Sequence, residues 1–514
     1  MTETAEALAF EVSRARFEAT LGVLMEKVIM MSHSELEDFL CTAGRELQCQ
    51  LYQDSLTLLA LLERRVNGVV DAKGIPRNSI EHNHRRPLTM IFGEVEVSRL
   101  AYRQRGHDNL YPVDALLNLP SEQYSLGLRR LAAIEASRGS FEDAAEAVER
   151  ITGVHLGKRQ VEELARRAAV DFHSFYDRVS PSSAEPKDLL VLSADGKGIV
   201  MRPEALREAT AKAATSTTGS HTRLSKGEKR NRKRMAEVGS VYDATPVPRT
   251  PQDIISIGHN SDEQTKPAPV AKNKWLTASV VEDAKTVISQ VFDEAQRRDP
   301  EFHRTWVVLV DGNNHQLDCI NAEAKARGVS VSIIIDFIHV LEYVWKAAYS
   351  FFKENDPAAE IWVAEKATAI LSGQSSTVAA AIRRKATSLQ LSPTKRQGAD
   401  DCADYLLNKT PYLKYDVALE KGWPIATGVI EGACKTLVKD RFDITGARWG
   451  LDGAETILKL RALRKNGDFE EYWKYHIAQE RHRVHEARYK NSIIPTPSFD
   501  TRHKKIRSHT LLST

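Results

Sequence analysis

The sequence has little of what disulfide-bonded, zinc-binding or membrane-spanning proteins need. Its five cysteines, at positions 41, 49, 319, 402 and 434, are odd in number and form no Cys-x-x-Cys pair. This spacing argues against a disulfide framework and a zinc ribbon, so reduced thiols in a cytoplasmic protein are the simplest interpretation. No apolar run reaches membrane-spanning length, and the first residues are acidic and helical rather than a secretion signal. We expect a soluble, cytoplasmic protein without membrane contact.

A large net charge is also absent. The 72 Lys and Arg residues oppose 69 Asp and Glu residues, which gives a formal net charge of +3. Because no field of the whole molecule attracts a polyanion, any nucleic-acid site must be a local patch.

The chain of 514 residues is too long to fold around a single compact core. Since domains usually contain roughly 100 to 200 residues, we expect three or more folded units.

The N-terminal region shows helical periodicity. Residues 1–70 predict a helical hairpin in which Ser34 and Glu37 form a capping box. Such helices could also supply a contact between copies of the chain. Residues 71–120 predict a connector with a small β-hairpin, turned at Gly93 and Glu94 and preceded by a polar, turn-like stretch over 78–87.

Residues 121–180 contain three helical stretches, and residues 153–157 separate the last two. The last stretch turns an apolar stripe inward and basic side chains toward solvent, namely Lys158, Arg159, Arg166 and Arg167. This pattern is typical of a helix-turn-helix DNA-binding domain with a basic second helix. Two ordinary packed helices with solvated charges are the alternative.

After residue 186 the pattern changes to apolar, β-rich runs. They cover residues 188–201, 274–281, 305–313 and 329–339, with helical stretches over 282–298 and 314–327. Alternation of this kind predicts an α/β layer. The helical, Ala-rich chain that follows is longer than a connection needs, so it predicts an inserted subdomain. We therefore expect a multidomain α/β plus α fold with a core over 186–345, a helical insertion over 346–420, the rest of the core over 421–466 and a basic tail over 467–514.

A basic segment lies within the α/β region. Residues 221–234 hold seven Lys or Arg residues and one Glu, with almost no apolar residues. The segment predicts a flexible loop that contacts phosphate, and a solvated surface is the alternative. The candidate contacts in it are Lys226, Lys229, Arg230, Arg232, Lys233 and Arg234.

Two acids follow buried apolar runs. Asp195 precedes Gly-Lys-Gly, and Asp311 precedes Gly-Asn-Asn-His. Open α/β sheets place their sites at the carboxyl ends of strands, although Asp-Gly is also a common turn dipeptide. Carboxylates that meet in space favour Mg²⁺ or Mn²⁺. Glu431 would complete a site for two ions roughly 3.5 to 4 Å apart; the alternative is a helix-capping acid that pairs with Lys435.

Four blocks surround these acids: LSADGKGIVMR, LVDGNNHQ, IDFIHVLEYVWKAA and GWPIATGVIEGACKTLVKDRFDITGARWG. They resemble the ISKra-type insertion-sequence transposases, distant relatives of the Mutator-like DDE transposases, and the resemblance runs from about Phe92 to Tyr489. It implies a ribonuclease H-like core interrupted by a helical insertion. The catalytic triad would then be Asp195, Asp311 and Glu431. Asp336 and His339 match a further family motif, for which a structural Asp and a packed core His are the alternative.

The resemblance implies a DNA transposase that binds the terminal repeats of its element and uses two Mg²⁺ or Mn²⁺ ions to cleave and join DNA strands. Supporting residues would be Lys197, Asn313 and His315, and further DNA contacts would be Lys435, Arg448 and Trp449, although Trp449 could equally be a core residue. The partners would be double-stranded DNA and a second or further copy of the chain. No nucleotide site is visible. In a bacterium the protein would associate with the nucleoid.

The chain departs from many transposases because it has no cysteine-rich N-terminal DNA-binding element. Recognition of the element ends would therefore rest on the helix-turn-helix candidate and the basic segments. Two other classes remain open. One is a ribonuclease H-like nuclease or resolvase that never joins strands, and the other is a DNA-binding protein without catalytic activity.

Overall fold

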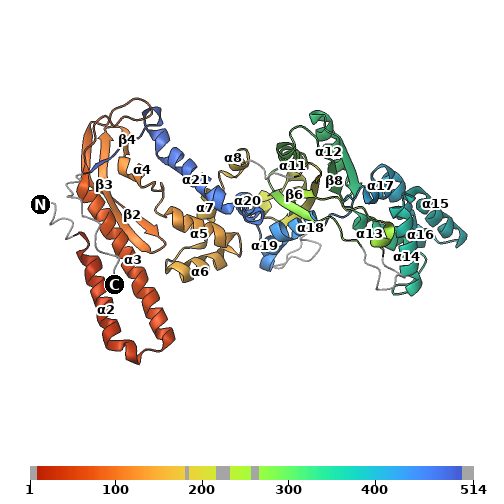
Figure 1. Ribbon diagram of the computed structural model, residues 1–514, viewed down its shortest axis with the longest axis horizontal. Coiled ribbons are helices and arrows are strands. Elements are labelled where there is room, and N and C mark those ends of the chain that lie inside the picture. Colours follow the sequence, from red (N-terminus) through yellow and green to blue (C-terminus); the bar gives the residue numbers. More distant parts are fainter. Residues whose placement is uncertain (1–8, 180–184, 216–231, 256–265, 500–514) are drawn as a thin grey trace. The chain divides into compact units, whose positions relative to one another are not determined.

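The protein is described by a computed structural model that covers residues 9–179, 185–215, 232–255 and 266–499 (Figure 1). The fold mixes helices and sheets in two compact units. The terminal unit combines Met1–Asp177 with Phe469–Thr514, and the central unit is Arg178–Asp468. The predicted α/β plus α organisation is therefore confirmed. No helix in the described ranges is long and apolar enough to cross a membrane.

The terminal unit begins with a helical hairpin of α2 (Glu11–Lys27) and α3 (His33–Leu62). The capping box at the start of α3 is formed by Ser32 and Glu35: the Ser32 hydroxyl accepts a hydrogen bond from the Glu35 amide, and the Glu35 carboxylate accepts one from the Ser32 amide. The prediction of Ser34 and Glu37 was wrong by two residues. Ser-x-x-Glu occurs twice in succession here, and the first copy starts the helix.

A three-stranded antiparallel sheet follows, in the order β2-β3-β4, with β2 at Ser79–Met90, β3 at Gly93–Gln104 and β4 at His107–Leu110. The stretch over 78–87, predicted to be turn-like, is a strand. Its residues up to Pro87 are exposed or half-buried, and its buried positions begin only at Leu88, so the first part of the strand carries no apolar pattern. Gly93 pairs with Met90, so the turn residues are Ile91 and Phe92, two residues earlier than predicted.

The helices that follow this sheet are α4 (Pro112–Leu116), α5 (Leu126–Ala136), α6 (Phe141–Thr152), α7 (Lys158–Ala168) and α8 (Phe172–Tyr176). The three predicted stretches are α5, α6 and α7, and five residues connect the last two. Ser140 caps the start of α6, because its hydroxyl accepts a hydrogen bond from the Asp143 amide. The stripe predicted to face inward on α7 is buried: Val161, Leu164, Ala165 and Ala168.

The C-terminal segment returns to the terminal unit as α21 (Phe469–Val484), which buries Phe469, Tyr472, Trp473 and His476. Further on, β10 (Ser498–Phe499) pairs with β1 (Glu63–Arg64). The prediction of a basic tail over 467–514 was therefore wrong for residues 469–499. The segment is basic overall, but the apolar side chains on one side of α21 are buried, and this burial makes the segment part of the folded unit.

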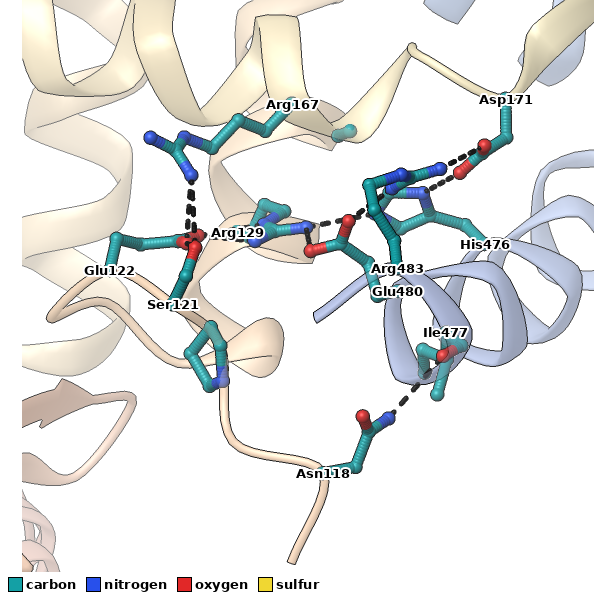
Figure 2. Close-up of polar contacts among 12 residues, drawn as sticks. Asn118, Ser121, Glu122, Arg129, Arg167, Asp171, His476, Ile477, Glu480 and Arg483 are labelled. Atoms are coloured by element: carbon teal, nitrogen blue, oxygen red, sulfur yellow. Dashed lines mark hydrogen bonds and ion pairs between the residues drawn. The ribbon is translucent and has the colours of Figure 1, made fainter. Parts of the chain in front are cut away.

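A buried polar network joins α21 to the preceding helices (Figure 2). The Arg129 guanidinium is fully buried and forms ion pairs with the carboxylates of Glu122 and Glu480. His476 lies with Nε2 3.1 Å from Arg129 and Nδ1 2.7 Å from Asp171. Because a guanidinium can only donate, Nε2 must accept and Nδ1 must carry the proton toward Asp171.

The central unit contains a five-stranded sheet in the order β7-β6-β5-β8-β9. Its strands are β5 (Leu189–Val200), β6 (Lys233–Ala244), β7 (Ala271–Ser279), β8 (Trp306–Val310) and β9 (Val331–Ile335). The first three are antiparallel, and β8 and β9 run parallel to β5.

The strand β6 was not predicted. Its first residues, Lys233 and Arg234, were assigned to the basic loop, and its buried part is rich in small residues. Gly239 is required there because an added Cβ would run into the Val291 side chain of α11 (Ala284–Arg298). α11 therefore packs closely on that face of β6.

Helices surround the sheet. Two that precede the insertion are α9 (Glu208–Thr215) and α12 (Asn314–Arg327). The region predicted as an insertion over 346–420 contains α14 (Pro357–Leu371), α15 (Ser375–Ser388), α16 (Pro393–Asn408) and α17 (Tyr415–Glu420), and it is preceded by α13 (Phe337–Ala348), most of which was assigned to the core. These helices share one apolar core with β8 and β9. The chain then forms α18 (Gly428–Ala433), a π-helix (Cys434–Lys439), α19 (Asp440–Phe442) and α20 (Leu451–Asn466).

Candidate active site

Asp195 was predicted to lie at the end of a strand, but it lies within β5. The strand continues to Val200 because β6 pairs with it throughout, but its parallel pairing with β8 stops at Ser193. Asp195 therefore lies where β5 loses its neighbour on one side. Its Oδ1 accepts a hydrogen bond from the Gly196 amide at 2.7 Å, and its Oδ2 lies 3.3 Å from the Cys434 sulfur.

Asp311 directly follows β8, as the sequence predicts. Its Oδ1 accepts a hydrogen bond from the Asn313 amide at 2.9 Å, and its main-chain oxygen accepts one from the Tyr405 hydroxyl at 3.1 Å. Gly312 has a φ of +93°. An added Cβ there would lie 2.8 Å from the Tyr405 hydroxyl oxygen and 3.0 Å from Cδ1 of Ile335. The helical insertion therefore supports the loop that carries Asp311.

Glu431 projects from the short helix α18, whose start is tied to the end of β9. Asp336 follows β9, and its Oδ1 accepts a hydrogen bond from the Ile338 amide at 3.0 Å. Its Oδ2 accepts one from the Thr427 hydroxyl at 2.7 Å, and both side chains are buried. This contact fixes where α18 begins, one turn before Glu431.

These acids line one cavity of about 190 Å³. Its titratable side chains are Asp195, Asp311, Asp336, His339, Glu342 and Glu431. All of them except Glu342 were predicted from the sequence as site residues. We call this cavity the acidic pocket. It joins β5, β8, the end of β9, α13 and α18.

Three predicted supporting residues do not line the acidic pocket. Lys197 points to solvent farther along β5. Asn313 caps α12 by accepting a hydrogen bond from the His315 amide at 2.9 Å. The His315 ring lies 3.9 Å from the sulfur of Cys319. These residues lie near the acids, but nothing in their contacts directs them into the cavity.

Basic side chains stay outside the acidic pocket, and the buried Lys409 interacts with Asp311 from beyond the lining. The lining itself contains no Lys or Arg. Over the described ranges no ion pair joins Asp195, Asp311, Asp336 or Glu431 to a basic residue, and the pairing of Glu431 with Lys435 is absent. His339 has its Nδ1 3.5 Å from Glu342. Several carboxylates that share one cavity repel each other and attract a cation.

The donor set of the acidic pocket suits a hard divalent cation, because carboxylate oxygens are the ligands that Mg²⁺ and Mn²⁺ prefer. Among the described residues, however, no three His, Cys, Asp or Glu side chains are grouped as the ligands of one ion. The chemistry of the residues therefore fits a metal, while the carboxylates would have to turn toward one another to hold it.

The prediction missed Glu342, Thr427 and Cys434. Glu342 follows Asp336 and His339 at intervals of three residues, which place all three on one face of a helix. Cys434 begins the π-helix after α18, a rare element that often marks functional sites. Burial and the adjacent Asp195 raise the pKa of its thiol, so the sulfur keeps its proton and donates it to the carboxylate. No sequence pattern indicated this contact.

The residues predicted to contact DNA lie in varied surroundings. Trp449 is buried, its ring centroid 4.5 Å from that of Phe442 and 4.6 Å from the Arg441 guanidinium, which favours the core alternative over stacking on a base. Exposed candidates are Arg159, Lys233, Lys435 and Arg448. Arg232 is half-buried. Lys226, Lys229 and Arg230 lie outside the described residues.

Several of the predicted contacts already have protein partners. Lys158 pairs with Glu142 at 2.8 Å, and Arg166 and Arg167 each pair with Glu163. Arg234 donates a hydrogen bond to the Val280 main-chain oxygen at 2.7 Å. Exposed ion pairs of this kind are weak, so they leave the outer face of α7 available to another anion.

Part of the chain is similar to a protein from a streptococcus. No family model matches the chain. A segment of 167 residues, 32% of the chain, is 26% identical to a protein of Streptococcus gallolyticus described as "UPF0236 protein in vanSb 3'region". The chain spans about a third of that relative's length, with 35% covered.

Proposed function

We propose that this protein is a DNA transposase of the DDE type that binds the terminal repeats of its element and catalyses DNA cleavage and strand transfer. The observation that carries the proposal is the acidic pocket, in which Asp195, Asp311 and Glu431 come from three distant parts of the sequence. These are the residues that the family resemblance assigns to the catalytic triad. Double-stranded DNA is the substrate, and we propose that a dimer or larger assembly holds the two ends of the element.

A ribonuclease H-like core is part of this proposal. Support comes from the strand order, with three antiparallel strands followed by two strands parallel to the first. The first two acids lie on neighbouring strands, β5 and at the end of β8, and the third acid comes from a helix after the insertion. In a bacterium such a protein would associate with the nucleoid.

The residues of the acidic pocket would hold two Mg²⁺ or Mn²⁺ ions, and bound ions would stabilise charge on the reacting phosphate and activate the attacking group. The protein itself positions the acids. Cys434 orients the Asp195 carboxylate, Tyr405 and Asn313 hold the Asp311 loop, and Thr427 fixes the start of α18. No side-chain nucleophile is required, because water attacks in the cleavage step and the released 3′-hydroxyl attacks in the joining step.

Strand joining distinguishes this proposal from its nearest alternative. With a labelled duplex that ends in the element's terminal sequence and a supercoiled target plasmid, we expect Mg²⁺-dependent products in which label is covalently attached to the plasmid. A resolvase or simple nuclease would yield cut duplex without label on the plasmid. A protein that only binds DNA would yield neither product.

The Asp311 loop offers a test of positioning. Gly312→Ala would strain a left-handed backbone and push against Tyr405 and Ile335, so we expect the cleavage rate to fall roughly 10 to 100-fold through displacement of Asp311. Gly328→Ala is the matched control, since Gly328 also has a positive φ but no atom within 4 Å of an added Cβ. Equal cleavage rates in the two variants would contradict the role of this loop.

A further inference from the structure

Two adjoining hollows in the terminal unit are rich in arginine. They share Ser121, Val484 and Arg488 in their walls. The larger, of about 460 Å³, also contains Arg167 and Arg483, and the smaller, of about 200 Å³, contains Arg86 and Arg99. We call them together the arginine hollow. It lies where α7, the 119–122 loop and the end of α21 come together.

Three arginines, two in the wall of the hollow and one buried beneath it, form ion pairs with three carboxylates. Arg129 pairs with Glu122 and Glu480 (Figure 2). Arg167 also reaches Glu122, and Arg483 pairs with Glu480 and Asp171, as the dashed contacts in Figure 2 show. This network holds Arg167 and Arg483 at the edge of the hollow, where both side chains remain partly exposed, at 39% and 45%.

Arg86 and Arg488 also belong to the hollow, and their hydrogen-bond partners in the described part of the chain are main-chain oxygens rather than carboxylates. Arg86 donates hydrogen bonds to the main-chain oxygens of Pro120 and Glu122, at 2.8 and 2.9 Å. Arg488 donates one to the main-chain oxygen of Asn109 at 2.9 Å. Within the described ranges neither guanidinium forms an ion pair with a carboxylate. Burial lowers the pKa of Arg86 and the carboxylates of Asp114 and Glu122 raise it, but a guanidinium stays charged at neutral pH. Asp114 also lines the smaller hollow, where it pairs with Arg99, so the wall keeps a net positive charge from Arg86 and Arg488.

We propose that the arginine hollow binds phosphate groups of the DNA backbone. This rests on the proposed function for the choice of DNA as the polyanion. Guanidinium groups match phosphate geometry through paired N–H donors. Arg167 belongs to α7, whose exposed side also carries Arg159 and Arg166, so a DNA strand seated in the hollow would continue along that helix. The DNA contacts predicted from the sequence then extend to Arg86, Arg483 and Arg488, which no motif indicated.

The test measures the affinity of the full chain for a fluorescent 30-base-pair duplex by anisotropy across a series of salt concentrations. Arg488→Gln should weaken binding roughly threefold to tenfold and lower the magnitude of the salt slope by about one, as the loss of one phosphate contact does. Arg481→Gln is the matched control, because Arg481 lies on α21, pairs with Glu486 and does not line either hollow. It should change affinity less than twofold.

A second variant adds charge instead of removing an arginine. Ser121 is exposed on the shared wall, so Ser121→Glu should weaken duplex binding without disturbing the core, whereas Ser55→Glu on the exposed side of α3 should not. Wild-type affinity in both Arg488→Gln and Ser121→Glu would overturn the inference, as would failure of the wild-type protein to bind the duplex at low salt. If polyglutamate binds with this arginine dependence and the duplex does not, the hollow serves an acidic protein surface and the inference is wrong.

A failure of the proposed function would be seen in the cleavage assay and not in duplex binding. If cleavage is absent, or survives Asp195→Asn, the transposase proposal fails. The arginine dependence of duplex binding would still stand in that case, because it is measured without metal and without catalysis.

Discussion

Glu431→Gln is expected to lower DNA cleavage by at least about a hundredfold while leaving DNA affinity unchanged. Substitutions that only support a metal ligand typically cost 10 to 100-fold, so the loss of a ligand should cost at least as much. The substitution keeps the size of the side chain, and over the described ranges the Glu431 carboxylate makes no hydrogen bond or ion pair; its main-chain bonds to Thr427 and Cys434 are unaffected by the change. The cleavage rate of labelled terminal DNA and the anisotropy of the same duplex are measured side by side.

Glu420→Gln is the control for this prediction. Glu420 is an exposed acid at the end of α17 and does not line the acidic pocket, so its substitution should leave cleavage within twofold of wild type. Cleavage at the wild-type rate by Glu431→Gln would exclude a catalytic role for this acid. A joint loss of cleavage and binding would instead indicate a structural role.

Arg129→Met is expected to destabilise the terminal unit by about 3 to 5 kcal/mol. The substitution leaves the carboxylates of Glu122 and Glu480 without their buried partner, and breaking one side of a buried ion pair has a cost of this size. It also removes the donor that faces Nε2 of His476. Hydrogen exchange of peptides from α5 and α21 measures the effect, and peptides from the central-unit sheet provide an internal reference.

The neighbouring Arg130 is a matched control. Its side chain is 37% exposed and pairs with Glu470, whereas that of Arg129 is 0% exposed. Exposed pairs contribute up to about 1 kcal/mol, so Arg130→Met should change protection only slightly. Equal loss of protection in the two variants would show that the buried network does not hold α21 in place.

Hydrophobic patterning predicted the parts of the fold in which it is strong. The apolar runs of β5, β8 and β9, the helices between them and the inward stripe of α7 were all visible in the sequence. β6 was missed because Gly239 and its small neighbours leave room for α11 instead of forming an apolar run. The C-terminal segment was misassigned because its basic residues masked the stripe of α21.

The individual acids of the candidate site could be predicted from the sequence, but the hydrogen bonds that position them could not. Asp195 and Asp311 follow apolar runs, so their neighbouring positions could be expected. The hydrogen bonds of Cys434 to Asp195 and of Thr427 to Asp336 connect residues 239 and 91 positions apart. Contacts at such distances depend on how α18 and the π-helix pack against the sheet, which local patterns do not encode.

Metal-dependent catalysis by the acidic pocket is tested by nicking of a labelled DNA fragment that carries the end of the element and its flanking sequence. The purified protein and its Asp195→Asn variant are each incubated with Mg²⁺ or with EDTA. We expect nicking at the element boundary by the wild-type protein with Mg²⁺, and none with EDTA or with the variant. Specific binding without nicking under Mg²⁺ or Mn²⁺, or nicking that persists in the variant, would contradict this role of the acidic pocket.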